Sequence, residues 1–505
     1  MSNPLYDTLF GGYIGSDTPF IETIDGKITT HGNFVAIASR LANAFHALGL
    51  KKGDRVAIQA EKSVTSLCVY AACIQSGVIF LPLNTGYTTA EVGYFIDDSG
   101  AKLFICDEKK VDDMKPILEK FGVTLKTLNA DGTGSITDLA KQQKNSFSPV
   151  DTNGDDLAAF LYTSGTTGKS KGAMLTQNNL LSNSKTLTKY WKFNDQDVLL
   201  HALPIFHTHG LFVAVNVSLM SGCKIILMPR FDVSQILDNM PKATVLMGVP
   251  TFYTRLLSET AFDAELTKNM RLFISGSAPL LAETHIEFEN CTGHRILERY
   301  GMTETNMSTS NPYDGERRAG TVGFALPGVE LKITDPESGL ELATGEIGNL
   351  EVRGPNVFKG YWNMPEKTKE ELREDGFFIT GDLGLVDEDG YLQIIGREKD
   401  LIISGGFNVY PKEIELVLDD QPGVVESAVI GVPHPDFGET PLGILVIEDT
   451  NVEFKISVIE NKIFEKLARY KHPRKLIIMN QLPRNTMGKV QKNVLREKYK
   501  EIFLS

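Results

Sequence analysis

Short apolar runs recur between longer stretches of helical periodicity, and this alternation decides the fold class. Such runs occur at 55–59, 78–83, 103–106, 157–162, 224–228, 244–247 and 272–274. Short β-branched runs separated by helices are typical of strands in α/β layers. Because the chain has 505 residues, one hydrophobic core cannot serve all of it, and we expect two or more domains.

The pattern changes after Gly328, where short strands separated by turns are expected at 329–334, 349–353, 377–380, 384–386 and 391–395. A turn-rich stretch, EKDLIISGGFNVYPK at 398–412, follows. Beyond it we expect a helix from Pro411, strands near 424–431 and 442–447, a helix near 454–467 and a last helix. The sequence therefore predicts a large α/β domain at 1–398 and a small α+β domain at 399–505.

Charge and composition exclude several classes of protein. The net charge of −13 argues against nucleic acid as a partner, because duplex binding needs an electropositive surface. The first thirty residues lack a basic segment followed by an apolar one, and no run approaches eighteen apolar residues. The five cysteines stand singly without a CxxC pair, which favours reduced core residues. We expect a soluble, cytoplasmic protein with no membrane partner.

The segment LAAFLYTSGTTGKSKGAML at 157–175 places an apolar strand before a loop rich in glycine, hydroxyls and lysine. Glycines allow backbone N–H groups to turn inward, and lysine offsets phosphate charge, so the loop can surround an anion. In a Walker A loop, G-x-x-x-x-G-K-S/T, the second glycine lies five residues after the first and is followed by lysine and then Ser or Thr. Here the residue five after Gly165 is Ser170, so that spacing fails.

YTSGTTGKSKG instead resembles the signature loop of the adenylate-forming superfamily of acyl-CoA synthetases, luciferases and peptide-synthetase adenylation domains. RYGMTET at 299–305, ITGDLG at 379–384, GREKDLIISGGFNVYP at 396–411 and PRNTMGKVQK at 483–492 are similar to further motifs of that superfamily, in the same order. The resemblance implies an N-terminal domain with α/β layers plus a distorted β-barrel-like part, and a mobile C-terminal lid. It also implies ATP and Mg²⁺ as cofactors and coenzyme A as co-substrate.

The resemblance assigns roles to residues that match these motifs. Thr303 is expected on the α-phosphate and Glu304 on Mg²⁺, while Asp382 and Arg397 are expected to bind the ribose. Tyr300 offers a flat face to adenine, and GSAPL at 276–280 lines the nucleotide and the floor of the acyl pocket. The remaining nucleotide-binding residues implied by the resemblance are Thr163, Ser164, Gly165, Thr166, Thr167, Gly168, Lys171, Ser277, Ala278, Pro279, Glu298, Gly301 and Met302.

Lys489 is similar to the catalytic lysine of the superfamily, which bridges the carboxylate substrate and the α-phosphate as negative charge builds up. Because this lysine lies about ninety residues past the expected domain boundary, the small domain has to close over the large one. The resemblance places a hinge at Lys399. It also places the approach of the CoA thiol along Ser404, Gly405, Gly406 and Phe407.

Other functions have less support in the sequence. Three histidines in HALPIFHTHG at 201–210 suggest zinc, but they lack helical spacing and a fourth ligand nearby. The resemblance instead places His207 beside the acyl pocket. No G-x-S-x-G elbow supports a serine hydrolase. Two alternatives stay open, an adenylation module that loads a carrier protein and an adenylate-binding regulator without turnover. We expect no carrier domain in the chain, which favours free CoA.

The acyl-pocket segments resemble those of bacterial malonyl-CoA synthetases, for example ALPIFHTHGLF, ATVLMGVPTFYTRLL and LERYGMTETNM. This resemblance implies a small dicarboxylate substrate, malonate, with methylmalonate as a second candidate and another small carboxylic acid as the alternative. Arg255 lies in an otherwise apolar predicted helix that starts at Pro250, and the resemblance assigns it to the far carboxylate. Ser277 and His207 are expected to complete the acyl pocket.

Overall fold

The computed structural model describes residues 2–163, 170–404, 407–448, 456–485 and 488–504. The chain divides into two compact units. The first comprises residues 1–330 and 352–378, and the second comprises residues 331–351 and 379–505. Segments 331–351 and 379–398, which the sequence assigned to the N-terminal domain, thus fall in the second unit. The predicted boundary after residue 398 concerns which segments move together, and it stays a prediction.

The first unit contains a six-stranded sheet in the order β6-β5-β3-β4-β7-β8. The strands are β3 (Arg55–Gln59), β4 (Ile79–Pro82), β5 (Leu103–Cys106), β6 (Thr124–Thr127), β7 (Leu157–Thr163) and β8 (Lys171–Thr176). All are parallel except β8, which runs antiparallel to β7. The crossovers are the helices α3 (Val64–Ser76), α4 (Thr89–Ser99) and α5 (Val111–Phe121).

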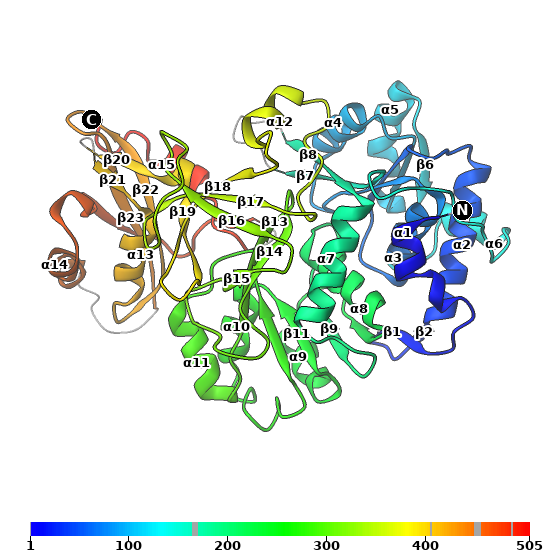
Figure 1. The fold of residues 1–505 in the computed structure, drawn as a ribbon, viewed down its shortest axis with the longest axis horizontal. Coiled ribbons are helices and arrows are strands. Elements are labelled where there is room, and N and C mark those ends of the chain that lie inside the picture. The colour runs from blue at the N-terminus through cyan, green and yellow to red at the C-terminus, as the bar shows by residue number, and fades with distance from the viewer. Residues whose placement is uncertain (1, 164–169, 405–406, 449–455, 486–487, 505) are drawn as a thin grey trace. The chain divides into compact units, whose positions relative to one another are not determined.

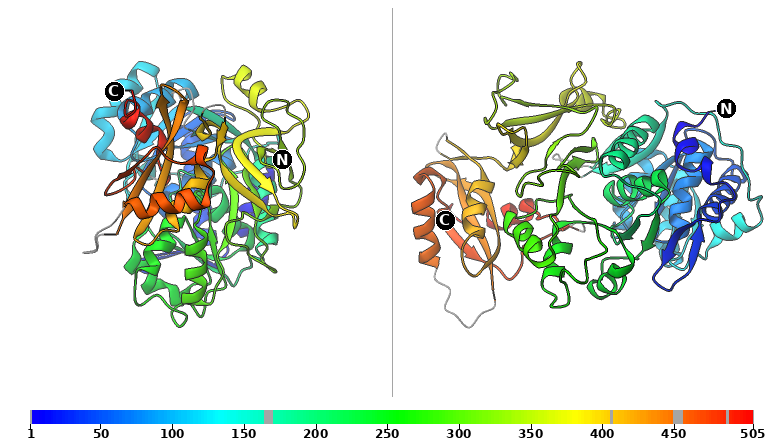
Figure 2. Two further views of the ribbon diagram at one scale, coloured as in Figure 1. Left: turned by 90° about the vertical axis from the view of Figure 1, so that its left-hand side faces the viewer. Right: turned by 60° about the horizontal axis from the view of Figure 1, so that its bottom comes forward.

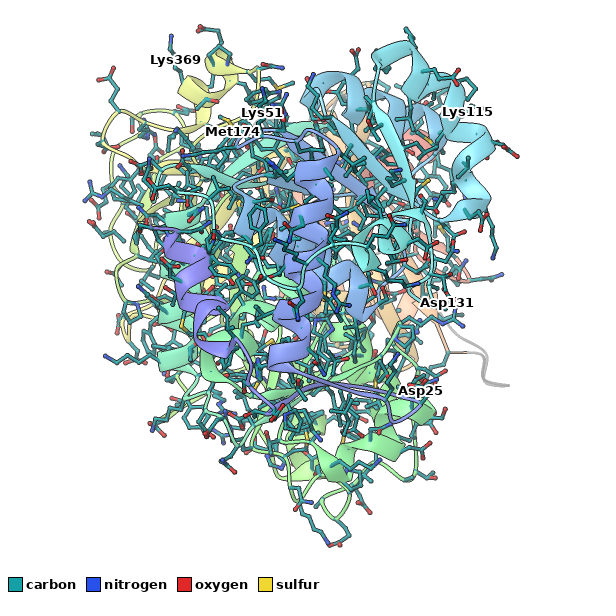
Figure 3. The ribbon with its side chains drawn as sticks, turned by 90° about the vertical axis from the view of Figure 1, so that its right-hand side faces the viewer. Asp25, Lys51, Lys115, Asp131, Met174 and Lys369 are labelled. Carbon is teal, nitrogen blue, oxygen red and sulfur yellow. The ribbon has the colours of Figure 1, made fainter. Side chains whose placement is uncertain are left out.

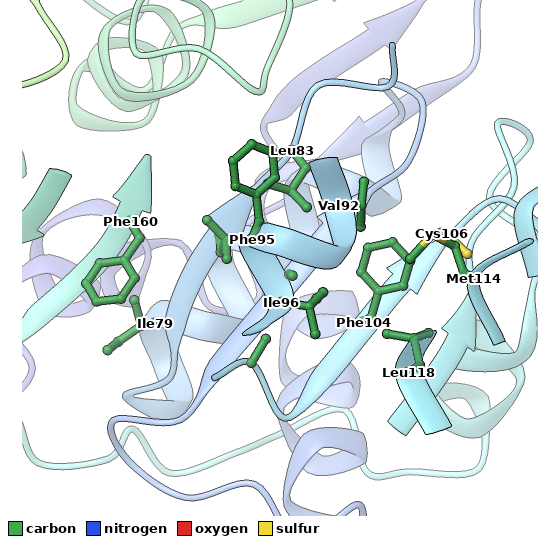
Figure 4. Packing of buried hydrophobic residues seen from close by; sticks show 13 residues of the cluster. Ile79, Leu83, Val92, Phe95, Ile96, Phe104, Cys106, Met114, Leu118 and Phe160 are labelled. Carbon is green, nitrogen blue, oxygen red and sulfur yellow. The ribbon is translucent and has the colours of Figure 1, made fainter. Parts of the chain in front are cut away.

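Two of these helices bury one face of the sheet. In α4 the side chains of Phe95 and Ile96 pack against Phe104 of β5, and α5 adds Leu118 (Figure 4). Full burial of each such side chain stabilises the fold by roughly 1.5–3 kcal/mol. Charged side chains, for example Lys51, Lys115 and Asp131, lie exposed on the outside of this unit (Figure 3).

A nine-stranded sheet forms the rest of the first unit, in the order β15-β14-β13-β12-β11-β9-β10-β1-β2 (Figure 1). The strands are β1 (Pro19–Thr23), β2 (Ile28–Thr30), β9 (Val198–His201), β10 (Lys224–Leu227), β11 (Val245–Gly248), β12 (Leu272–Ser275), β13 (Leu297–Met302), β14 (Asn306–Ser310) and β15 (Phe324–Ala325). From β1 to β13 neighbouring strands are parallel. Their carboxyl ends therefore meet at one edge of the sheet.

The first unit contains further helices. They are α1 (Pro4–Leu9), α2 (His31–Ala47), α6 (Ser135–Lys141), α7 (Gln177–Tyr190), α8 (Asn216–Ser221), α9 (Val233–Asn239), α10 (Pro250–Leu257), α11 (Ala282–Thr292) and α12 (Pro365–Glu371). The start of α10 at Pro250 confirms the helix predicted from the sequence, since proline suits the first turn of a helix. All seven strands predicted from apolar runs in this unit are also confirmed.

The second unit holds two smaller sheets. One has the order β16-β17-β18-β19, with strands β16 (Glu330–Thr334), β17 (Gly348–Arg353), β18 (Phe378–Val386) and β19 (Leu392–Arg397). The predicted separation of 377–380 from 384–386 is wrong, because β18 is one strand with a bulge between Leu383 and Gly384. Among the residues that the structure describes, no sheet closes on itself, so the expected barrel-like part is an open sheet.

The other sheet has the order β21-β20-β23-β22, and β24 pairs with β23. Its strands are β20 (Ile402–Ser404), β21 (Phe407–Val409), β22 (Val424–His434), β23 (Gly438–Ile447) and β24 (Lys475–Ile478). Alternate residues of β22 face opposite layers. Val429 packs with α13 (Pro411–Asp419) and α14 (Ile456–Lys466), and Ile430 packs with α15 (Lys492–Tyr499). Figure 2 shows the ribbons of α14 in orange and α15 in red. The α+β prediction for this part is confirmed.

Candidate active site

The predicted acyl and nucleotide residues of the first unit follow the carboxyl ends of neighbouring parallel strands. Gly248 ends β11, Ser275 ends β12 and Met302 ends β13. In open α/β sheets this edge is where ligands bind. The segments GSAPL and MTET therefore lie at the edge of the sheet where ligands are expected to bind.

Ser277 has the left-handed conformation, with φ of +71°. A non-glycine residue in this region stores strain and is found disproportionately at functional sites. Its Oγ lies 3.3 Å from Nδ1 of His209. His209 begins a fully buried π-helical turn, His209–Val215, a distortion that frequently marks functional sites. The serine predicted for the acyl pocket is thus paired with His209, which was not among the predicted site residues.

Arg299 on β13 is the main residue that the sequence analysis missed. It is 3 % exposed, and its Nε and Nη2 have no hydrogen-bond partner. Burial lowers the pKa of its guanidinium to about 9. A Cβ built on Gly276 would lie 2.4 Å from Cζ of Arg299, so a side chain at position 276 would displace the guanidinium. A buried cation of this kind needs an anion, and no carboxylate of the described residues pairs with it.

The other two histidines of HALPIFHTHG make local contacts. Nδ1 of His201 lies 3.1 Å from Nζ of Lys62, and Nε2 lies 2.7 Å from the carbonyl oxygen of Gly210. Burial and the adjacent Lys62 lower the pKa of His201 to about 3, so the ring is neutral. Nδ1 of His207 accepts the backbone N–H of His209 at 3.3 Å. No group of three or more potential metal ligands occurs in the described part of the chain.

Glu304 is buried in the turn between β13 and β14, next to Thr303. Its Oε1 accepts a hydrogen bond from Oγ1 of Thr163 at 3.3 Å and lies 3.0 Å from the hydroxyl of Tyr361. A single carboxylate beside a phosphate-binding loop suits Mg²⁺, which prefers one or two carboxylates plus substrate phosphates. Glu304 therefore fits the predicted metal role.

The phosphate loop is described only at its two ends. Ser164, Gly165, Thr166, Thr167 and Gly168 lie outside the described residues. Lys171, the first residue of β8, is buried, and its Nζ contacts both carboxylate oxygens of Glu371 at 3.1 and 3.2 Å. The loop lysine is therefore held by a carboxylate from a distant segment.

The predicted nucleotide wall lies on β13 and after β12. Glu298 is buried and paired with Nδ1 of His285 at 3.2 Å, and burial raises the pKa of its carboxyl. Tyr300 is half-buried, and a Cβ on Gly301 would lie 1.9 Å from the carbonyl oxygen of Asn306. Glycine at 301 is thus required by the close approach of β14. Of the remaining wall residues, Ala278, Met302 and Thr303 are half-buried and Pro279 is exposed.

In the second unit, Asp382 of β18 and Arg397 of β19 form a register pair with Nε to Oδ1 at 2.6 Å. Lys489 as a whole is exposed. Partial desolvation of its ammonium, and then repulsion from Arg397, lower the pKa of Lys489 to about 8. The residues expected to bind ribose and to act on the α-phosphate therefore share one electrostatic environment.

The predicted hinge and thiol-approach residues also lie in the second unit. Lys399 is in a short 3-10 turn, Glu398–Asp400, and burial lowers the pKa of its ammonium. Ser404 ends β20 and is buried, while Phe407 of β21 is exposed and stacks on Tyr470 at 4.8 Å between ring centroids. Gly405 and Gly406 lie outside the described residues.

Arg255 lies on α10 and is exposed to solvent. Among the residues that the structure describes, no hydrogen bond or ion pair joins its guanidinium to Ser277 or His209. The structure thus places one predicted arginine at the surface and an unpredicted one, Arg299, in the interior. The signal for Arg299 in the sequence is an arginine that follows the apolar residues Ile296 and Leu297 and stands next to Glu298 in ILERYGM.

Comparisons with known proteins agree with the fold. The family model described as AMP-binding enzyme matches residues 15–362, and that described as AMP-binding enzyme C-terminal domain matches 413–489. A malonate–CoA ligase of Arabidopsis thaliana is 36% identical over 94% of this chain and 85% of that protein. A long-chain-fatty-acid–CoA ligase, FadD13, of Mycobacterium tuberculosis is 34% identical over 95% of both.

A search of solved structures gives a stronger match. The crystal structure of ATP-bound MatB from Rhodopseudomonas palustris has a TM-score of 0.98 and 57% sequence identity, covering all of both chains. In the described residues of the present protein, no helix has both the length and the apolar character needed to cross a membrane. The chain belongs to the family of AMP-binding enzymes.

Proposed function

We propose that this chain is an AMP-forming acid–thiol ligase that joins malonate to coenzyme A. A malonate carboxylate oxygen attacks the α-phosphorus of ATP, diphosphate leaves, and malonyl-adenylate forms. The sulfur of CoA then attacks the acyl carbon, AMP leaves with the electron pair of the broken bond, and the thiol proton passes to solvent. The malonate–CoA ligase relatives, which match 94% of the chain in one case, support this assignment.

The single observation that carries the substrate class is the buried guanidinium of Arg299. Its Nε and Nη2 are unpartnered, and Nε lies against Gly276, in the segment that leads to Ser277. A second carboxylate on the substrate would supply the missing counter-charge through charge-assisted hydrogen bonds. A monoacid would leave the guanidinium unpaired in a dry site, which is strongly unfavourable. Arg255, exposed on α10, stays a second candidate for this carboxylate.

The chain's other residues are assigned to the first half-reaction as follows. Thr163 and Lys171, with the loop residues 164–168, bind the triphosphate, and Thr303 contacts the α-phosphate. Glu304 holds Mg²⁺, which would offset the charge of the phosphates. Asp382 and Arg397 bind the ribose, and Lys489 donates to the oxygens on which negative charge develops. Ser277 and His209 orient the acid, with His207 beside them.

In the second half-reaction the small domain turns about Lys399. The segment 404–407 then lines the path of the CoA thiol. A reducing, cytoplasmic location suits the cysteines, which are all free in the structure. A ligase for another small acid, or a module that loads a carrier protein, remains the alternative function.

The test is an acid panel scored by CoA-dependent release of AMP, with malonate, methylmalonate, succinate, oxalate, acetate and butyrate. Malonate should have the highest kcat/KM. Methylmalonate should follow within about 200-fold, because one extra methyl group changes binding by only about 1–3 kcal/mol. Acetate and butyrate should fall at least about 100-fold below malonate. A monoacid as the best substrate, or AMP release only with a holo-carrier protein, would refute the proposal.

A further inference from the structure

Glu371, the last residue of α12, is the centre of a charged network inside the first unit. Its two oxygens receive Nζ of Lys171 at 3.1 and 3.2 Å, and Oε1 also receives Nζ of Lys367 at 3.0 Å. Oε2 accepts the hydroxyl of Tyr361 at 2.7 Å. Only 21% of the Glu371 side chain is exposed. One carboxylate thus gathers the phosphate-loop lysine, a second lysine and a phenol.

Tyr361 extends the network to Glu304. Its hydroxyl lies 3.0 Å from Oε1 of Glu304, the same oxygen that accepts from Thr163. The ring of Tyr361, which is 3 % exposed, lies under the ammonium of Lys171 at 4.0 Å from the centroid. An ammonium over an aromatic face is attracted by the ring quadrupole. Tyr361 therefore touches both the lysine and the two carboxylates.

The charges of the network fix its protonation. Burial acts to raise the pKa of Glu371, but hydrogen bonds from Tyr361, Lys367 and Lys171 hold it below its usual value, so the carboxyl is ionised at neutral pH. Burial and the two carboxylates raise the pKa of Tyr361, so the phenol keeps its proton. That single proton is shared between Glu371 and Glu304, because both oxygens lie within hydrogen-bond distance.

The four groups come from three segments that lie far apart in the chain. Lys171 begins β8, Glu304 precedes β14, Tyr361 lies in the segment before α12, and Glu371 ends that helix. Apart from Glu371 itself and Lys367, which pairs with it, the charged residues of α12 lie exposed. Lys369 projects outward with its side chain 75% exposed (Figure 3), and the side chain of Glu370 is 63% exposed. The inward face of α12 thus carries one carboxylate, aimed at the phosphate-loop lysine.

We propose that Glu371 and Tyr361 are positioning residues for adenylation. Glu371 holds the ammonium of Lys171 where the triphosphate binds, and Tyr361 ties the same carboxylate to Glu304. The phosphate-binding cation and the magnesium-binding carboxylate consequently keep a fixed separation. The inference rests on the proposed function in taking Lys171 and Glu304 as the phosphate and magnesium residues. Neither Glu371 nor Tyr361 touches substrate in this account.

The first experiment is a double-mutant cycle on malonate-dependent exchange of diphosphate into ATP. Glu371→Gln should raise KM for ATP at least about tenfold at saturating Mg²⁺, because Lys171 loses its anchor. In a Lys171→Met background the same change should raise KM by less than about twofold, because it then has no lysine to position. If the two changes instead multiplied their separate effects on KM for ATP, Glu371 would act independently of Lys171. That result would overturn the proposal.

The matched control is Glu370→Gln on the same helix. Glu370 contacts only Lys367 among the ion pairs of the described residues, and KM for ATP should stay within about twofold of the parent enzyme. Equal effects of the Glu370 and Glu371 changes would assign both to the stability of α12. Failure of the parent enzyme to exchange diphosphate with malonate would instead refute the proposed function and is scored separately.

Tyr361→Phe tests the contact between Tyr361 and Glu304. If Glu371→Gln does not fold, this variant decides the proposal. The change keeps the ring under Lys171 and removes only the hydroxyl. The Mg²⁺ concentration for half-maximal exchange should rise at least about fivefold, while KM for ATP at saturating Mg²⁺ stays within about twofold. An unchanged magnesium requirement would show that Tyr361 does not act through Glu304.

Discussion

Arg299 and Gly276 fit each other at the carboxyl ends of two neighbouring parallel strands. The guanidinium of Arg299 occupies the space that a side chain at position 276 would need, with 2.4 Å from the constructed Cβ to Cζ. Because residue 276 of the segment GSAPL is glycine, the buried guanidinium has room beside it. Since Arg299 has unpartnered nitrogens, we propose that the pair is a preformed receptor for an anionic group.

The buried charge should make the free enzyme less stable. Replacing Arg299 with Met keeps much of the volume and removes a desolvated guanidinium without a counter-charge, which should stabilise the fold by about 1 kcal/mol or more. Differential scanning calorimetry without ligand should show a rise in Tm of about 2 °C or more. The exposed Arg255→Met is the control and should leave Tm unchanged. A fall in Tm for Arg299→Met would mean that the guanidinium is satisfied within the protein.

Lys489 should act in only one half-reaction. Lys489→Ala should nearly abolish formation of malonyl-adenylate, because the ammonium meets charge that develops only in that step. Formation of malonyl-CoA from supplied malonyl-adenylate should stay largely intact. Single-turnover assays of the two steps measure this directly, and an equal loss in both would contradict the assignment.

The pH dependence of adenylation follows from the same lysine. Its ammonium has a pKa lowered to about 8, so the charged form predominates below that pH and is lost as pH rises through it. Diphosphate exchange should therefore decline above about pH 8, approaching a tenfold loss per pH unit. In Lys489→Arg the residue cannot titrate, and whatever activity it retains should stay level up to about pH 9. A decline at the same pH in both proteins would assign the titration to another group.

Lys399 should matter for the change between the two half-reactions. Lys399→Pro fixes φ near −65° at the predicted hinge, so the thioester step should slow more than the adenylate step. Lys399→Ala, which leaves the backbone free, is the control. Unchanged rates of both steps in the proline variant would remove the hinge from this position.

The sequence was informative about elements whose signal is local. Apolar runs of four to six residues gave β3, β5 and β7, because buried parallel strands need continuous apolar side chains. The predicted division of β18 was wrong because the glycine and aspartate in ITGDLG are typical of a turn. Gly381 does adopt a positive φ of +68°, but pairing with β19 continues on both sides of the bulge at Leu383 and Gly384.

The site was less predictable, because its key contacts join distant segments. Motifs predicted site roles for Thr163, Glu304 and Ser277. The links that Tyr361 and Glu371 make to Glu304 and Lys171 span 57 and 200 positions. No local pattern encodes such pairing. Arg299 and His209 were missed for a related reason: a charged residue in an apolar run is recognised as buried only when its strand is placed at the sheet edge.

The measurement that most directly tests this account is kcat/KM of Arg299→Met with malonate and with butyrate, with Arg255→Met assayed alongside. We predict that malonate efficiency falls at least about 100-fold in Arg299→Met, equivalent to roughly 2.7 kcal/mol, while butyrate stays level or improves. Loss of malonate use in Arg255→Met alone would move the receptor to α10. Malonate use that survives the change at Arg299, or a parallel loss with both acids, would contradict the account, because Arg299 would then not be the group that selects a second carboxylate.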